Sequence, residues 1–256
     1  MKKKDKICYR CGKIATSDEH VPPKGLFPEQ KDIKIDLRKN LFTVPSCDEH
    51  NSKKSDDDEF LLLCLAGSAR GNLVGFYHFM TKGRRAISRK HVGFLDQILK
   101  DTTFTNLVDK EGNIRRALKG RMNIKRLNKC FENISYGLYF IENKEVFEGE
   151  VKIINGFSEI ESKNHKSFID VVEYSFENDQ SKHTERGENK EVFFYQFTDP
   201  DKFGLISLRF CFYGTLYVYA ALIPKGSKKP FDLGIELVKN GVKTIYNLGD
   251  KTIEFN

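Results

Sequence analysis

Tryptophan is absent from this chain of 256 residues, methionine occurs only three times, and no run of about 18 consecutive apolar residues is present. Without such a run, the sequence predicts no membrane-spanning helix. The first residues, MKKKDK, are basic, but no apolar stretch follows them, so they lack the pattern of a signal peptide. We therefore expect a cytoplasmic protein that is long enough to bury a core in one domain or two.

A disulfide pattern is also missing. The six cysteines are Cys8, Cys11, Cys47, Cys64, Cys130 and Cys211. Cys64 and Cys211 lie in apolar stretches and are typical of small buried hydrophobic residues. The first three cysteines lie close to the N-terminus with tight spacing, which does not indicate disulfides in a cytoplasmic chain.

Acidic residues are scarce in one part of the chain. The net charge is +7, and residues 61–135 carry 15 Lys and Arg against 5 Asp and Glu. The densest basic runs are KGRRAISRK, at 82–90, and RRALKGRMNIKR, at 115–126. A concentrated positive segment favours a phosphate-bearing partner. The alternative is a solvated basic helix face that has no partner.

The N-terminal part of the chain lacks long periodic segments. Residues 7–51 consist of short extended pieces that are broken by Gly, Pro and polar turns. A helix is expected to begin near Ser46 or Cys47, because the Ser46 hydroxyl could cap its first N–H groups. Asp48 and Glu49 would then suit its first turn.

Hydrophobic periodicity in the rest of the chain predicts the α+β class. The apolar spacing from about 59 to 135 is mostly helical, and both basic runs are expected on helices. Antiparallel strands are expected from 136 onward, among them FIDVVEYSF at 168–176 and a hairpin around Tyr213 and Gly214. We divide the chain into a domain at 1–60, a basic helical segment at 61–135 and a β-rich C-terminal domain of unknown role at 136–256.

Two pairs of metal-ligand residues frame the N-terminal segment. They are Cys8-x-x-Cys11 and Cys47-x-x-His50. Gly12 suits a tight turn after the first pair, and an i, i+3 spacing places the second pair on one face of the expected helix. Four nitrogen and sulfur ligands satisfy tetrahedral Zn²⁺, so we expect a structural zinc. The alternative is that Cys8 and Cys11 are an incidental pair of reduced thiols.

The segment between these pairs resembles the HNH endonuclease family, whose fold is the ββα-metal nuclease with a zinc-knuckle frame. The resemblance covers residues 8–60 and rests on pieces that occur in the family's order. These pieces are CYRC, DEHVPP, the Asn40-Leu41 dipeptide and VPSCDEHNSKKSDDDE. It implies a metal-dependent endonuclease that hydrolyses phosphodiester bonds, with residues 1–60 as the nuclease domain.

The resemblance also implies roles for individual residues. His20 would be the general base that takes a proton from the attacking water, and Glu19 and Asn51 would bind a catalytic Mg²⁺ or Mn²⁺ through oxygen. Asn40 would brace the loop that carries the base. The stretch Val21-Pro22-Pro23 would fix the exit from the strand, so that Glu19 and His20 are aimed.

The sequence departs from the family at two positions. The family usually has Asp before the base, whereas here Glu19 precedes it and Asp18 stands one place earlier. The last zinc ligand is often Cys, whereas here it is His50, which could alternatively bind the catalytic ion. The acidic run at 56–59 is interpreted as a solvated face rather than a metal site.

The basic runs would then bind double-stranded DNA through its phosphates. The residues predicted to do so are Arg84, Arg85, Arg89, Lys90, Arg115 and Arg116. A role in defence against foreign DNA would fit a nuclease joined to an unfamiliar domain. The chain could form a homodimer, and whether it nicks DNA or breaks both strands would depend on dimerisation.

Two alternatives remain. In the first, the chain is a non-catalytic, zinc-stabilised module that binds nucleic acid or a protein partner. In the second, the nuclease is kept silent by its C-terminal domain. No membrane partner is expected.

Overall fold

A computed structural model describes residues 6–51, 55–89, 99–108, 112, 114–158, 163–178, 184–227 and 237–256. It contains helices and antiparallel sheets, so the predicted α+β class is confirmed. None of the helices within the described ranges has the length and apolar character needed to cross a bilayer.

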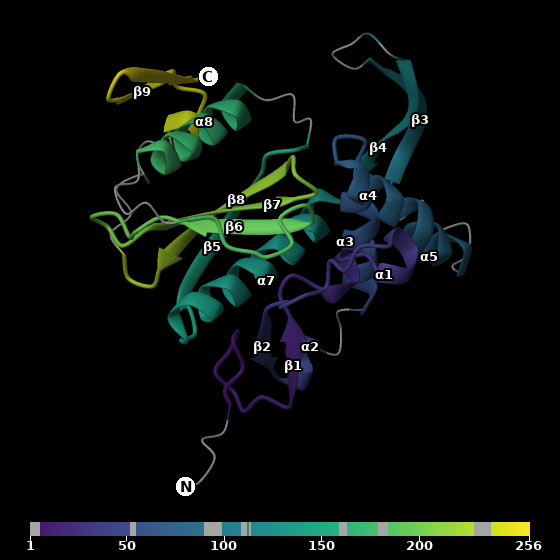
Figure 1. The fold of residues 1–256 in the computed structure, drawn as a ribbon. Helices are drawn as coiled ribbons and strands as arrows, with labels where there is room; N and C mark the ends of the chain where they lie inside the picture. Colours follow the sequence, from purple (N-terminus) through teal and green to yellow (C-terminus); the bar gives the residue numbers. More distant parts are fainter. Residues whose placement is uncertain are drawn as a thin grey trace, which may run out of the picture.

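A four-stranded antiparallel sheet forms the centre of the molecule (Figure 1). Its strands, in spatial order, are β5 (Gly149–Asn155), β8 (Leu216–Pro224), β7 (Ile206–Phe212) and β6 (Phe193–Phe197). β7 and β8 form the hairpin that was predicted around Tyr213 and Gly214, with Phe212 in register with Leu216. Gly214 has a φ of +76°, which a glycine adopts without steric cost.

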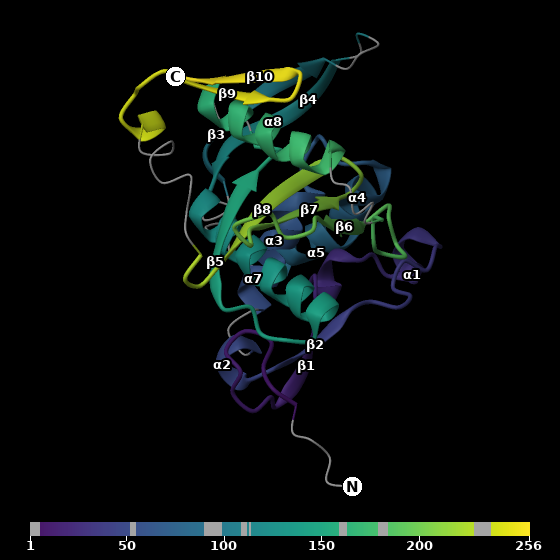
Figure 2. The same ribbon diagram turned by 90° about the vertical axis from the view of Figure 1, so that its left-hand side faces the viewer.

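Helices cover both faces of this sheet. Helix α7 (Ile124–Asn143) packs against β5 and β8 on one face, and α8 (Lys163–Glu177) contacts β5 and β7 on the other (Figures 1 and 2). Alternate residues of a strand point to opposite faces, so β8 buries Leu216, Val218 and Leu222 toward the main core. Tyr219 points the other way and donates to Glu173 of α8.

The prediction of a strand at 168–176 is wrong, because these residues belong to α8. Phe168, Val171 and Phe176 recur at helical spacing, and this spacing outweighs the β-branched composition. Helix α8 also packs against a second hairpin, formed by β9 (Thr244–Leu248) and β10 (Lys251–Phe255). A small separate core holds these elements together, with Phe168 against Phe255.

The N-terminal segment begins with two short antiparallel strands, β1 (Ser17–His20) and β2 (Thr43–Ser46). The 3-10 helix η1 (Lys24–Leu26) and the short helix α1 (Gln30–Ile33) lie between them in the chain. Helix α2 (Asp48–Asn51) follows β2 directly. The expected cap at Ser46 is wrong, since Ser46 ends β2. The first hydrogen bonds of α2, from the His50 and Asn51 N–H groups, go to the Cys47 carbonyl.

Four further elements surround this segment. Helix α3 (Ser55–Ala66) is followed by α4 (Leu73–His78), the π-helix η2 (Phe79–Gly83) and α5 (Arg84–Arg89). The run Phe60–Ala66 of α3 is buried throughout, because α3 contacts η1, α4, η2 and α7. The helices predicted in this part of the chain are therefore present.

The prediction of helix is wrong for residues 99–108 and 114–122. These residues form an antiparallel hairpin of β3 (Leu99–Val108) and β4 (Ile114–Met122). Asn123 then caps α7 by accepting a hydrogen bond from the Arg126 N–H at 3.0 Å. The basic run at 115–126 is consequently divided between a strand and the first turn of a helix.

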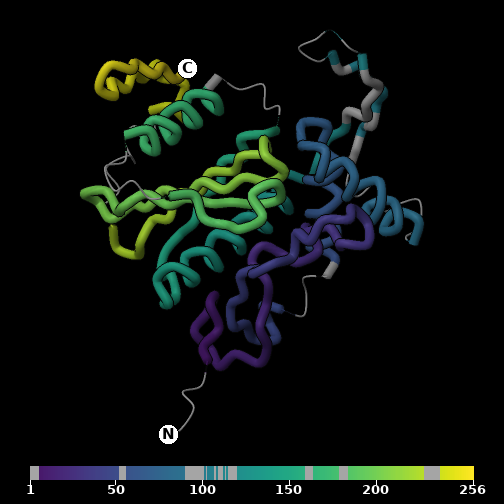
Figure 3. Tube along the Cα trace, viewed as in Figure 1, coloured from purple at the N-terminus to yellow at the C-terminus, as the bar shows by residue number. Residues whose placement is uncertain are grey.

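One continuous hydrophobic core includes residues from all three segments of the chain, from Cys8 to Leu222. Tyr213, at the tip of the β7–β8 hairpin, is fully buried, and its hydroxyl donates to the Leu26 carbonyl at 2.7 Å. The course of the chain in Figure 3 shows the N-terminal segment and the β9–β10 hairpin at opposite ends of the molecule.

Candidate metal centre and adjoining pocket

Cys8, Cys11, Cys47 and His50 converge on one point. Their ligand atoms all lie within 4.8 Å of one another. The Cys11 and Cys47 sulfurs are 3.8 Å apart, and His50 Nδ1 lies 3.2 Å from Cys47 Sγ and 3.8 Å from Cys8 Sγ. No other group of three or more such ligands occurs within the described part of the chain.

The local fold explains why these ligands meet. A tight turn brings Cys8 and Cys11 together, with the Gly12 N–H bonded to the Cys8 carbonyl at 2.9 Å and a Gly12 φ of +73°. Cys47 directly follows β2, and His50 lies in the single turn of α2. The Tyr9 N–H bonds to the Pro45 carbonyl at 2.9 Å, which fixes the turn against the end of β2.

The cluster has the ligand set of a tetrahedral zinc ion. With Zn–S bonds of about 2.3 Å, two sulfurs of a tetrahedron are about 3.8 Å apart, and a sulfur and a nitrogen are slightly closer. The Cys11–Cys47 distance of 3.8 Å has the first of these lengths, and the two sulfur–nitrogen distances, 3.2 and 3.8 Å, lie on either side of the second. The expected four-ligand site is therefore present as a cluster that could hold a metal ion such as zinc, and His50 lies in it.

Hydrogen bonds favour the thiolate form of Cys8. Burial alone would raise the pKa of this thiol, but hydrogen bonds with the backbone of Arg10, Cys47 and Cys11 lower the pKa below its ordinary value. Since a metal binds the thiolate, these bonds prepare Cys8 as a ligand.

Glu19 and His20 lie at the end of β1, in register with Val44 and Thr43 of β2. Tyr9, which is fully buried in the Cys8–Cys11 turn, donates from its hydroxyl to Glu19 Oε1 at 3.3 Å. His20 is partly buried. Its pKa is lowered by burial first and then by the positive charges of Lys24 and Arg38.

The two residues border an open pocket, which also extends between α3 and α7. Its polar lining residues are Glu19, His20, Asp57, Asp58 and Asn133. Arg126 Nε donates to Asp57 Oδ1 at 2.7 Å. The first turn of α3 was interpreted from the sequence as a solvated face, and the structure places two of its carboxylates at the pocket. The sequence did contain a signal for this position, because the first turn of α3 closely follows the pair of metal-ligand residues Cys47 and His50.

The two predicted asparagines lie elsewhere. Asn51 donates from its amide to Ser17 Oγ at 2.7 Å and is not among the described residues that line the pocket. Asn40 has a φ of +48°, which asparagine tolerates better than most residues, and its amide donates to Glu188 Oε2 at 2.6 Å. It borders a small separate pocket together with Val21, the residue after His20.

Most of the predicted phosphate-binding arginines on α5 already have carboxylate partners. Arg85 makes two hydrogen bonds to Asp32, at 3.1 and 2.7 Å, and Arg89 pairs with Glu59 at 3.2 Å. Arg84 is exposed. Lys90 lies outside the described residues. Arg115 and Arg116 lie in β4, not on a helix.

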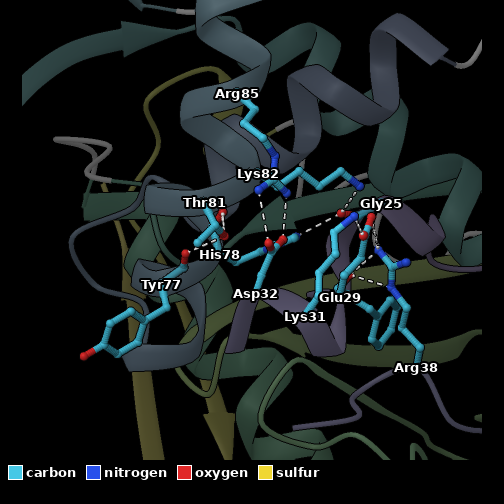
Figure 4. Close-up of polar contacts among 11 residues, drawn as sticks. Gly25, Glu29, Lys31, Asp32, Arg38, Tyr77, His78, Thr81, Lys82 and Arg85 are labelled. Carbon is cyan, nitrogen blue, oxygen red and sulfur yellow. Dashed lines mark hydrogen bonds and ion pairs between the residues drawn. The ribbon is translucent and has the colours of Figure 1, made fainter. Parts of the chain in front are cut away.

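A polar cluster joins α4, η2 and α5 to the N-terminal segment (Figure 4). His78 is fully buried, and its Nε2 lies 3.0 Å from the Gly25 carbonyl, which also accepts from Lys82 Nζ at 3.1 Å. Burial lowers the pKa of His78 to about 4, so it is neutral near pH 7. No role was assigned to His78 from the sequence, and its position indicates a structural one.

Comparisons with protein-family models, with curated proteins and with solved structures returned no match for this chain.

Proposed function

We propose that this protein is a metal-dependent endonuclease that hydrolyses phosphodiester bonds of DNA, with His20 as its general base. The observation that carries the proposal is the joint position of Glu19 and His20. Both lie at the end of β1, at the edge of an open pocket, and Tyr9 joins Glu19 to the turn that supplies two ligands of the Cys₃His cluster. An acid and a base are thus held at the same cleft by a rigid frame.

The state of His20 suits a general base. Because burial and the charges of Lys24 and Arg38 lower its pKa, the imidazole is neutral near pH 7 and can accept a proton. In the proposed reaction a water molecule attacks the phosphorus, His20 takes one proton from that water, and the bond from phosphorus to the 3′ oxygen breaks. The leaving oxygen takes a proton from solvent.

The donors around the pocket fit a hard cation. Glu19 would hold Mg²⁺ or Mn²⁺ with its carboxylate, and Asp57 and Asp58 offer further oxygen atoms at the same pocket. Mg²⁺ usually keeps several of its waters and binds to a protein through only one or two carboxylates. A Mg²⁺ site at this pocket therefore does not need three protein ligands that point at one position. When bound, the ion would supply positive charge beside the phosphate.

The decisive experiment is cleavage of supercoiled plasmid in Mg²⁺ or Mn²⁺. Wild type is compared with His20→Ala, and with His165→Ala as a matched control on α8. All three proteins are first shown to be folded and loaded with zinc. We expect His20→Ala to be slower by at least about 100-fold, since general base catalysis contributes that much, and His165→Ala to be unchanged. Equal activity of His20→Ala and wild type would contradict the role of His20.

The second candidate is a zinc-stabilised module that binds nucleic acid without cutting it. It is favoured by the contact of Asn51 with Ser17, because the amide that the resemblance would place on the catalytic ion is hydrogen-bonded within the frame. DNA binding by a wild-type protein that leaves the plasmid intact would select this candidate.

A further inference from the structure

The β3–β4 hairpin projects from the body of the molecule. Figure 1 shows it extending beyond α4, away from the four-stranded sheet. Its two strands pair with each other along their length, and no other described element packs extensively against either of them. At about 3.3 Å per residue, the nine residues of β4 give an arm about 30 Å long.

Basic residues are concentrated on this arm. β4 contains Arg115, Arg116, Lys119 and Arg121 and no acidic residue, whereas β3 contains one lysine and one aspartate. Since alternate positions of a strand share a face, Arg115, Lys119 and Arg121 occupy positions on one face of the ribbon. Lys100 is in register with Arg121 and adds a fourth basic position there.

The other face of the ribbon holds Arg116 and several exposed apolar residues. Phe104, Val108 and Ile114 are 67%, 65% and 68% exposed, and Val108 is in register with Ile114. Exposed apolar side chains gathered on one face are typical of an interaction surface. The ribbon therefore has most of its basic positions on one face, and its exposed apolar residues together with Arg116 on the other.

We propose that the β3–β4 ribbon is a DNA-binding arm that lies in the major groove of a duplex, with its basic positions against the phosphates. The major groove is about 12 Å wide and admits a two-stranded ribbon, so both faces of the ribbon come close to the DNA. The apolar side chains then meet base edges, where thymine methyl groups offer apolar contacts. Charge complementarity selects this occupant over a second copy of the chain, which carries the same positive charge.

The root of the arm leads to the pocket. β4 is followed by Asn123 and α7, whose first turn contacts α3 through the Arg126–Asp57 pair. Asn133, two turns further along α7, lines the pocket with His20. At 1.5 Å per residue, Asn123 and Asn133 are separated by about 15 Å along the helix. A duplex held by the arm would therefore pass close to the proposed base. The choice of DNA as the partner rests on the proposed function.

The test measures the binding of a fluorescent 20-base-pair duplex by anisotropy, in the full-length His20→Ala background, at several salt concentrations. The arm variant carries Arg115→Gln, Arg116→Gln and Lys119→Gln. A matched control with the same loss of charge carries Lys152→Gln, Lys190→Gln and Lys243→Gln, at exposed positions outside the arm.

We expect the arm variant to bind at least tenfold more weakly, and the slope of log K against log salt to fall by about two to three, since each lost phosphate contact reduces it by about 0.9. The control should change affinity less than threefold. Arg121 is 85% exposed and pairs with Asp101 of the same arm at 3.6 Å. Arg121→Glu should weaken binding alone and guards against misfolding of the triple variant.

Equal losses in the arm variant and the control would overturn the proposal. A second result would also overturn it: the arm variant binds DNA as wild type does, but is a monomer where wild type is a dimer. The ribbon would then join two copies of the chain. The readout is independent of cleavage. Arm-dependent binding by a protein that never cuts DNA would support the arm and refute the nuclease.

Discussion

Tyr9 donates a hydrogen bond from its buried hydroxyl to Glu19 Oε1 at 3.3 Å. Tyr9 lies between Cys8 and Cys11 in the metal-binding turn, and Glu19 lies at the edge of the pocket beside His20. The bond therefore links the Cys₃His cluster directly to the carboxylate that is proposed to hold the catalytic ion. A zinc ion that takes no part in the reaction would still set the direction of that carboxylate.

Tyr9→Phe should lower the rate of metal-dependent cleavage by about 10-fold or more. Loss of a hydrogen bond that orients a metal-binding carboxylate typically costs 10- to 100-fold in metal affinity or activity. The measurement is the cleavage rate as a function of Mg²⁺ concentration, and we expect the half-saturating concentration to rise.

Zinc content, determined by mass spectrometry of the metals, is the control for this variant. It should stay at one ion per chain, because no ligand is changed. A rate loss that higher Mg²⁺ does not reverse would argue against an orienting role for Tyr9.

Removal of the zinc should destabilise the whole protein. Cys47→Ser replaces a central ligand of the cluster, and we expect loss of bound zinc and a lower melting temperature, since structural zinc contributes folding free energy. Cys211→Ala, at a buried cysteine in β7 far along the chain from the cluster, should keep its zinc. Full zinc content in Cys47→Ser would show that the cluster is not the binding site.

The pH profile of cleavage should report His20. A base must be neutral, and the pKa of His20 is lowered from its usual value near 6.5 by burial and by Lys24 and Arg38. The rate should therefore be nearly constant between about pH 7 and 8, and should fall only below pH 6.5, as the imidazole gains a proton. In Lys24→Gln, which removes one of these charges, the falling limb should move to higher pH. If the fall in rate occurs at the same pH in Lys24→Gln as in wild type, the titrating group is not His20.

The stability of the fold should also decrease as the pH is lowered, because of His78. Burial lowers its pKa in the folded protein to about 4, opposed by the bond to the Gly25 carbonyl and assisted by the charges of Lys82 and Arg38. In the unfolded chain its pKa is near 6.5, so the unfolded state binds the proton first as the pH drops. The free energy of unfolding should decrease between about pH 6.5 and 4, by about 3 kcal/mol in total.

Denaturant unfolding of wild type and His78→Gln at pH 7 and pH 4.5 tests this. The difference between the two proteins at each pH removes most of the contribution of zinc release, which affects both. Wild type should lose more stability than the variant on acidification. Parallel losses would show that His78 does not contribute.

The cluster of Cys8, Cys11, Cys47 and His50 could be predicted from the sequence, because each pair is set by local geometry. A tight turn fixes the first pair, and one helical turn fixes the second. The β7–β8 hairpin was predictable for the same reason, since β-branched and aromatic residues flank a glycine turn.

The ribbon at 99–122 and helix α8 were assigned incorrectly because both carry mixed signals. Apolar residues of α8 recur at 168, 171, 172 and 176, which is a helical spacing, but all four are β-branched or aromatic. In the ribbon, the pairing of Phe104 with Leu118 is a contact across fourteen residues. A periodicity confined to one short window does not reveal such a pairing.

The pocket could be predicted only in part. Glu19 and His20 are adjacent in the chain, and the family pattern marks them. Asp57 and Asn133 reach the same pocket from α3 and α7, and their approach depends on tertiary packing that leaves no local pattern. The partners of Arg85 and Arg89 were hidden for the same reason, because Asp32 and Glu59 lie far from them in sequence.

The bond from Tyr213 to the Leu26 carbonyl has a consequence for synthesis. The N-terminal segment buries its core against residues that the ribosome adds some 180 positions later. A nascent chain of the first hundred residues therefore lacks the surfaces that hold β1 and the pocket in place. The contacts that hold the N-terminal segment, and with it the pocket, therefore form only after β7 and the tip of the β7–β8 hairpin have been synthesised.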